Sequence, residues 1–522
     1  MTSFKVNIKW GKELYKDIEV STSEPPVVFK AQLFALTNVA PERQKIMFKG
    51  QSLGDDSWSN FEKHLKDNVT FMMMGSCDPI PQITTQQANA VFLEDLNEQQ
   101  LALELDLPVG LKNLGNTCYL NAVLQCFKTV PELTQSLEVF KSKRASDSDL
   151  LNGLVLSMCT TYEYMDKHKM NGFAPILLVQ LLRTILPNFA ATSQDGSFMQ
   201  QDANECWTEL MRILQQKLAP LSKNSKYTNF IDQYFSGEFT SNWKCVESSE
   251  EQETQNKESF LQLSCFISQD VKYLQTGIKL RLEEQLTKFS QTLGRDAIYS
   301  KTSKISRLPA YLCIQNVRFF YKEKDKISAK ILKDVKFTIQ LDAFELCTPE
   351  LQQKLIPMRE KFRIVDDKNA HEARELKKKL LDSASPMDVD MKTAISKATP
   401  LTTGNVYDSF SFEDDTGSSN SGLYELIAVL THKGRSSNSG HYVGWCKNPK
   451  TSQWMMFDDD NVNPVTDEDI LKLSGGGDWH TSYLLLYGPR KLDLNRYKEA
   501  TANSDNTISK TVVDQTADNK QK

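Results

Sequence analysis

A cysteine directly before a helical apolar pattern is the first candidate for chemistry in this sequence. The apolar residues that follow it are spaced i, i+3, i+4 and i+7, which is one face of a helix: Leu120, Val123, Leu124 and Phe127. Cys118 therefore lies at or next to a helix N-terminus, where unpaired backbone N–H groups and the helix dipole favour a thiolate. This is the chemistry of an activated nucleophile, although a thiol at a helix start is more often structural.

An amide stands five residues upstream of this cysteine. Asn113 lies in the turn-rich segment 110–117, and its side-chain NH₂ can reach back toward the carbon that Cys118 would attack. A donor placed in this way stabilises the developing oxyanion by about 2.7–4 kcal/mol. A nucleophile of this kind also requires a base.

The base that fits best is His441. It follows a loop of small residues, 433–440, and opens an apolar run that ends at Cys446. The loop composition predicts a mobile segment that leads directly into the histidine. The alternative interpretation is a surface histidine near an acidic turn.

A carboxylate follows in the next predicted strand, 454–458. A turn centred between residues 449 and 450 places His441 opposite Asp458 in an antiparallel hairpin, with Cβ atoms about 4.5–5.5 Å apart. A slip of two residues would place Asp460 or Met456 opposite the histidine instead. The choice among Asp458, Asp459 and Asp460 therefore stays open from register alone.

The elements that must position these residues belong to a chain of more than one domain. At 522 residues it exceeds the size at which one hydrophobic core stops growing. A net charge of -5 in mixed order gives no basic stripe, so nucleic acid is not an expected partner. No apolar run reaches about 18 residues, so membrane insertion is not expected. No C-x-x-C pair occurs among the 10 cysteines, and neither metal nor cofactor is predicted.

The segments around these residues resemble the ubiquitin-specific protease family. GLKNLGNTCYLN corresponds to the cysteine box, and SGHYVGW with WMMFDDDNV to the histidine and aspartate boxes. QQDANECW, LPAYLCIQNVRF and YLLLYG match as well. The resemblance implies Cys118 as nucleophile, Asn113 as oxyanion donor, His441 as base and Asp458 as the orienting carboxylate, with Asp459 as an auxiliary.

The resemblance also implies an α+β fold and a substrate. The family fold is a papain-like thumb and palm with a β-rich fingers extension, and the reaction is hydrolysis after the terminal glycine of ubiquitin. Candidates for binding the ubiquitin tail are Asp202, Glu205 and Tyr442; Asp202 equally fits the cap of the helix it precedes. Many members bind zinc through two C-x-x-C pairs in the fingers, but Ser248 stands where Cys245 would need its partner.

The N-terminal segment has a separate pattern. Alternation over residues 4–20, a helix from 25 to 36, and strands at 44–50 and 69–73 give the order of a β-grasp domain, and QKIMFKGQSL resembles ubiquitin. Ile46 and Met47 would lie near an apolar patch for receptors. A ubiquitin-like domain before the protease points to the proteasome-associated branch of the family, docked on the proteasome regulatory particle.

We therefore expect four regions: a ubiquitin-like domain at 1–75, a polar linker at 76–104, a catalytic domain at 105–490 with a mobile insertion at 383–421, and a disordered tail at 491–522. The expected location is the cytoplasm, and the nucleus as a second compartment. The expected partners are ubiquitin and ubiquitinated proteins. The alternative function is a catalytically silent ubiquitin-binding adaptor at the proteasome.

Overall fold

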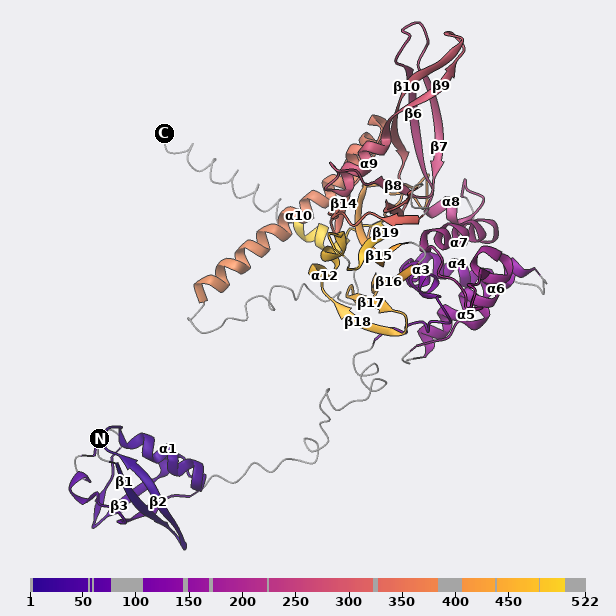
Figure 1. The fold of residues 1–522 in the computed structure, drawn as a ribbon. Helices are drawn as coiled ribbons and strands as arrows, with labels where there is room; N and C mark the ends of the chain where they lie inside the picture. The colour runs from indigo at the N-terminus through magenta and orange to yellow at the C-terminus, as the bar shows by residue number, and fades with distance from the viewer. Residues whose placement is uncertain are drawn as a thin grey trace, which may run out of the picture. The chain divides into compact units, whose positions relative to one another are not determined.

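The computed structural model of the chain describes residues 3–54, 57–58, 61–76, 107–143, 149–168, 172–222, 225–322, 327–383, 406–436, 439–477 and 479–502. The described residues belong to two compact units, Met1–Leu96 and Asn97–Lys522, and each unit has a hydrophobic core of its own (Figure 1). The predicted linker at 76–104 lies, apart from residue 76, outside the described residues.

The first unit is a five-stranded sheet in the order β2-β1-β5-β3-β4. β5 runs parallel to β1 and antiparallel to β3, and Phe29 and Leu33 of the helix join the strands in one core. This β-grasp arrangement confirms the predicted fold of the segment. Its elements are β1 (Ser3–Trp10), β2 (Glu13–Ser21), α1 (Pro26–Thr37), β3 (Lys45–Phe48), β4 (Gln51–Ser52) and β5 (Thr70–Met74), with 3-10 turns at Pro41–Arg43 and Glu62–His64.

The outer face of this sheet corrects one predicted docking residue. Ile46 is 0% exposed and belongs to the core, so its side chain cannot contact a receptor. Alternate residues of a strand face opposite sides, and Met47 accordingly lies on the other face, half-buried and paired with Met72. Met72 is 51% and Met74 is 53% exposed. The apolar surface of this sheet is therefore built from methionines on β3 and β5.

The second unit begins with a cluster of helices. Every residue from Cys118 to Phe127 on α3 is buried, and Phe127 stacks on Trp207 of α7 with ring centroids 4.2 Å apart. The first helix is thereby fixed at the centre of the unit. The helices are α3 (Cys118–Lys128), α4 (Pro131–Ser142), α5 (Leu150–Lys167), α6 (Ile176–Ile185), α7 (Ala203–Lys217) and α8 (Phe230–Tyr234), with a 3-10 turn at Pro187–Ala190.

A 10-stranded sheet packs against α3. Its main path is β18-β17-β16-β15-β19-β11-β8, and α3 lies against β16 at Gly444, where an added Cβ would stand 3.4 Å from the Ala122 carbonyl oxygen. The strands are β8 (Leu263–Phe266), β11 (Leu312–Val317), β12 (Phe319–Lys322), β13 (Ile327–Lys330), β14 (Gln340–Asp342), β15 (Leu423–Ser436), β16 (Ser439–Lys447), β17 (Trp454–Asp458), β18 (Asn461–Val465) and β19 (Thr481–Pro489). α12 (Asp467–Leu471) and 3-10 turns at Phe344–Leu346 and Lys472–Ser474 border the sheet.

A second, four-stranded sheet in the order β7-β6-β10-β9 extends from this body (Figure 1). It is the predicted fingers extension. Cys245 packs there against Ala297 and Tyr299, and Glu251 accepts hydrogen bonds from Tyr299 at 2.6 Å and Ser290 at 2.8 Å. The elements are β6 (Gly237–Cys245), β7 (Thr254–Phe260), α9 (Leu274–Leu282), β9 (Glu283–Ser290) and β10 (Arg295–Arg307).

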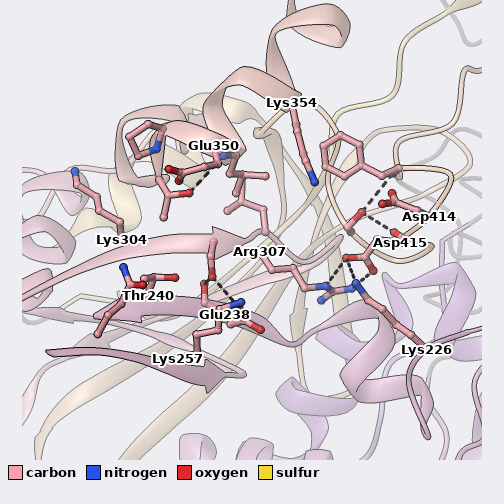
Figure 2. Close-up of a pocket in the computed structure, with 18 of the residues that line it drawn as sticks. Lys226, Glu238, Thr240, Lys257, Lys304, Arg307, Glu350, Lys354, Asp414 and Asp415 are labelled. Atoms are coloured by element: carbon pink, nitrogen blue, oxygen red, sulfur yellow. Dashed lines mark hydrogen bonds and ion pairs between the residues drawn. The ribbon is translucent and has the colours of Figure 1, made fainter. Parts of the chain in front are cut away.

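The prediction of a mobile insertion over 383–421 is wrong for residues 406–421. Ser418, Ser419 and Ser421 are at most 3% exposed. Asp415 accepts two hydrogen bonds of 2.9 Å from the Arg307 guanidinium, and Lys226 approaches the same carboxylate at 3.0 Å (Figure 2). These contacts attach the segment to the base of the fingers. Residues 384–405 lie outside the described residues.

The predicted disordered tail is also wrong at its start. Residues 494–502 are helical, and Leu492 is buried against Phe362 and Val365 of the long helix α10 (Pro349–Ser383). Composition alone missed this contact because only a few apolar residues, Leu492, Tyr497 and Ala500, pack in an otherwise polar segment. Residues 503–522 lie outside the described residues.

The Arg307–Asp415 pair gives a stability prediction. Its side chains are only 10% and 12% exposed, so Asp415→Ala leaves a buried guanidinium uncompensated and should destabilise the catalytic unit by about 3 kcal/mol in urea unfolding. Asp414→Ala is the matched control, because Asp414 is exposed, and should change stability by less than about 0.5 kcal/mol. Equal stability of the two variants would contradict the anchoring role.

Candidate active site

Cys118 is the first residue of α3, as the apolar spacing predicts. The turn before it is fixed by its own hydrogen bonds: Thr117 Oγ1 accepts from the Leu114 N–H at 2.8 Å, and Asn113 Oδ1 accepts from Gly115 and Thr117. The chain reverses through left-handed backbone at Gly115 and Asn116. The thiol is thereby held at the helix N-terminus on a rigid turn, with Cys118 only 2% exposed.

His441 and Asp458 meet on neighbouring strands. His441 Nε2 lies 2.5 Å from Asp458 Oδ1. The predicted register is wrong by two residues, because Trp445 pairs with Met456 rather than Trp454. The turn is longer than expected: Asn448 N–H donates to Gln453 O, and Ser452 takes a left-handed conformation. Despite the shift, the carboxylate that reaches the histidine is the predicted one.

The loop that leads into His441 is not the mobile segment that its composition suggests. β15 and β16 pair at Lys433↔His441 and again at Ser436↔Ser439, with a shift of register between the two pairs. Residues 437–438 lie outside the described residues. The histidine is therefore carried by a β-hairpin along most of the segment 433–440.

The electrostatics of the site favour a charged histidine. The hydrogen bond to Asp458 and a second hydrogen bond with the Cys118 thiol raise the pKa of His441 to about 10, although partial burial acts in the opposite direction. The same contact with His441 lowers the pKa of Asp458. Because Nε2 is engaged by Asp458, Nδ1 is left for the thiol. The arrangement can take a proton from Cys118 and hold it on the imidazole next to Asp458.

Asp459 joins the cysteine turn to the aspartate strand. Its Oδ1 accepts from Asn121 Nδ2 at 2.8 Å, and its Oδ2 accepts from Asn113 Nδ2 at 2.9 Å. Burial raises the pKa of Asp459, and the two amide donors oppose this shift. One N–H of Asn113 is therefore occupied. The predicted donation to an oxyanion would have to use the second N–H of the amide.

The three candidates for the ubiquitin tail have different surroundings. Asp202 Oδ1 caps α7, accepting from the N–H groups of Asn204 and Glu205, and both its carboxylate oxygens also accept from the Tyr483 hydroxyl. The capping interpretation of Asp202 is thus confirmed. Glu205 is exposed on the first turn of the same helix. Tyr442 is only 1% exposed, and its contact with the ubiquitin tail stays a prediction.

Gln200 is a residue that sequence reasoning missed. Its side-chain Nε2 lies 3.3 Å from Cys118 Sγ. It stands 82 positions after the cysteine, inside the QQDANECW box, but no local spacing links it to the thiol. Only the fold brings the two together.

Three side chains of the site lie close enough together to be possible metal ligands. Ligand atoms of His441, Asp458 and Asp459 all lie within 4.8 Å of one another. Each is already engaged: His441 with Asp458, and Asp459 with two amides. A cavity of about 850 Å³ lies elsewhere, at the base of the fingers around Arg307 (Figure 2).

Comparison with known proteins places this constellation in a family. The family model described as "Ubiquitin carboxyl-terminal hydrolase" matches residues 109–487, a span that includes Cys118, His441 and Asp458. The chain belongs to the ubiquitin carboxyl-terminal hydrolase family. It is a cysteine-type deubiquitinase, and the predicted protease fold is confirmed.

Relatives extend over nearly the whole chain. Ubiquitin carboxyl-terminal hydrolase 14 of Caenorhabditis elegans is 41% identical over 488 residues, 93% of this chain and 93% of that protein. Ubiquitin carboxyl-terminal hydrolase 7 of Arabidopsis thaliana is 39% identical and covers 94% of this chain and 99% of its own length. Ubiquitin carboxyl-terminal hydrolase 6 of Schizosaccharomyces pombe is 36% identical, with 92% and 98% covered.

One solved structure is also similar. The SAGA deubiquitinating module bound to ubiquitin aldehyde aligns with a TM-score of 0.49 and 21% identity, and the alignment covers 74% of this chain and 70% of that one. Among the residues described here, no helix combines the length and apolar character that a membrane crossing requires.

Proposed function

We propose that Cys118, His441 and Asp458 act as nucleophile, base and orienting carboxylate in the removal of ubiquitin from proteins. The observation that carries this proposal is the position of His441: its Nε2 lies 2.5 Å from Asp458 Oδ1, and the neighbouring Cys118 thiol helps to raise its pKa. A nucleophile bonded to a base that is itself oriented by a third group is the arrangement that acyl transfer requires.

The steps follow from these positions. The Cys118 thiolate attacks the carbonyl carbon of the terminal glycine of ubiquitin, and a sulfur–carbon bond forms. His441 gives its proton to the leaving amine as the carbon–nitrogen bond breaks. Water, deprotonated by His441, then attacks the thioester and releases ubiquitin and the free thiol. Throughout, Asp458 stabilises the imidazolium and keeps Nδ1 directed at the reacting atoms.

Recognition of the ubiquitin tail falls to acidic side chains at the start of α7. The tail carries arginines before its two glycines, and carboxylates bind guanidinium groups through charge-assisted hydrogen bonds. Glu205 suits this role because it is exposed at the start of α7. Asp202 is already engaged by the helix cap and by Tyr483, so its contribution is to fix the first turn of α7 on which Glu205 stands.

Substitution of the three residues tests the assignment. Cys118→Ala should abolish hydrolysis of a ubiquitin–fluorophore reporter while binding of ubiquitin is preserved, and His441→Ala should behave alike. Asp458→Asn should retain more activity, since an orienting group is the least costly member of such a triad to lose. Full activity of Cys118→Ala would refute the nucleophile. The silent-adaptor alternative would be supported if a ubiquitin derivative with an electrophilic C-terminus bound without covalent capture at Cys118.

We further propose that the first unit docks the enzyme on the proteasome regulatory particle, in the cytoplasm and the nucleus. Support comes from the β-grasp fold and from the exposed methionines of its sheet, Met72 and Met74, which flank half-buried Met47. Flexible thioether side chains suit an apolar receptor surface. The trimming of ubiquitin from proteasome substrates would follow from this location.

A charge placed on this face tests the docking site. Met72→Glu should weaken binding of the full chain to isolated proteasomes at least about tenfold, because a carboxylate would be buried without a partner. Phe34→Glu is the matched control, since Phe34 is 43% exposed on α1, away from the sheet face, and should bind as the unmodified chain does. Equal affinity of the two variants would contradict the proposed face.

A further inference from the structure

We infer that Gln200 is a catalytic residue, whose side-chain amide donates a hydrogen bond to the oxyanion formed when Cys118 attacks ubiquitin. The inference rests on the proposed role of Cys118 and adds a residue to that site. It starts from one contact, the 3.3 Å separation between Gln200 Nε2 and Cys118 Sγ.

The amide has no other hydrogen-bonding task. Among the residues that the structure describes, the Cys118 sulfur is the hydrogen-bond partner of both ends of the Gln200 side chain, with Oε1 at 3.7 Å and Nε2 at 3.3 Å. Asn113, in contrast, is occupied at both ends of its amide, with Asp459 on Nδ2 and with Gly115 and Thr117 on Oδ1. The Gln200 amide thus contacts the thiol and is not held by hydrogen bonds to other described side chains or backbone groups.

Neighbours on both sides fix the position of Gln200. Two residues before it, the Phe198 carbonyl accepts from Asn116 Nδ2 at 2.8 Å, so this segment is tied to the cysteine turn itself. The Phe198 ring lies 3.5 Å from the Arg183 guanidinium, and Arg183 also donates to the Gly115 carbonyl at 3.1 Å. Two residues after it, Asp202 caps α7. The backbone that carries Gln200 is therefore held in place before substrate arrives, which limits the reorganisation needed to stabilise the oxyanion.

The reaction geometry brings the oxyanion within reach of this amide. The attacked carbon becomes bonded to Sγ, and the oxygen that gains charge is bonded to that carbon. A donor in contact with Sγ needs only a side-chain rotation to reach this oxygen. Cys118 is the first residue of α3, and backbone N–H groups in the first turn of a helix have no intrahelical partner, so the Cys118 N–H can supply a second donor. The developing charge is thus met by groups on two separate segments.

The test compares three variants of the full chain. Gln200→Ala removes the amide. Gln200→Glu keeps nearly the same shape but offers no N–H when ionised. Gln201→Ala is the matched control, because the Gln201 amide donates to the Met199 carbonyl and not to the thiol. Free ubiquitin binding and thermal unfolding confirm that each variant is folded.

Both Gln200 variants should lower kcat about 100-fold on a ubiquitin–fluorophore reporter, with KM unchanged. Affinity for ubiquitin aldehyde, which forms a tetrahedral adduct with the thiol, should fall in parallel, whereas affinity for free ubiquitin should not. The rate of Cys118 alkylation by iodoacetamide should keep its pH dependence. Gln201→Ala should match the unmodified chain in every measurement.

Two results would overturn the inference. An unchanged kcat in Gln200→Ala would remove Gln200 from the reaction, and a shifted alkylation profile would show that the amide acts on the resting thiolate instead of the oxyanion. Neither result would change the assignment of Cys118 as the nucleophile. That assignment is tested by covalent capture of a ubiquitin derivative and by the activity of Cys118→Ala.

Discussion

The whole site depends on the hydrogen bonds of Asp459. Its carboxylate accepts from Asn113 of the cysteine turn and from Asn121 of α3, and its backbone carbonyl accepts from the Leu111 N–H at 2.9 Å. Residues separated by 346 positions are thereby held in contact. Asp459 immediately follows Asp458, so the same backbone that carries the orienting carboxylate also fixes the turn that carries the thiol.

This junction explains a requirement for glycine. The chain passes so close to the Asp459 and Asp460 backbone at Gly110 that an added Cβ would stand 2.6 Å from the Asp459 carbonyl oxygen. Any side chain there would push the cysteine turn away from the β17–β18 turn. The distance between the thiol and the histidine is thus set by backbone contact as well as by the side chains that react.

Local patterns predicted the parts of this site that lie within one element. The i, i+3, i+4, i+7 spacing placed Cys118 at the start of a helix, and strand alternation placed His441 and Asp458 in one hairpin. The register failed because Ser452 adopts a left-handed conformation in a turn longer than the sequence suggested. In the first unit, alternation gave the strands, but not which of Ile46 and Met47 would face the core.

Contacts between distant segments could not be read from the sequence. Gln200 reaches Cys118 only because α7 and the cysteine turn are tied together through Phe198 and Asn116. Residues 406–421 looked mobile by composition, yet a buried arginine from β10 fixes them. In both cases the deciding interaction joins polar groups whose partner is chosen by the tertiary fold.

We expect His441 to be an imidazolium held between Asp458 and Cys118. Because both contacts raise its pKa to about 10, the histidine should stay charged at neutral pH and lose its proton only as the pH approaches that value. Its titration can be followed by NMR in chain labelled at histidine carbons, with the signal assigned by its loss in His441→Gln. We predict a titration midpoint of His441 near pH 10, and a lower midpoint in both Asp458→Asn and Cys118→Ala. A midpoint near the ordinary value of 6.5 in the unmodified chain would contradict it.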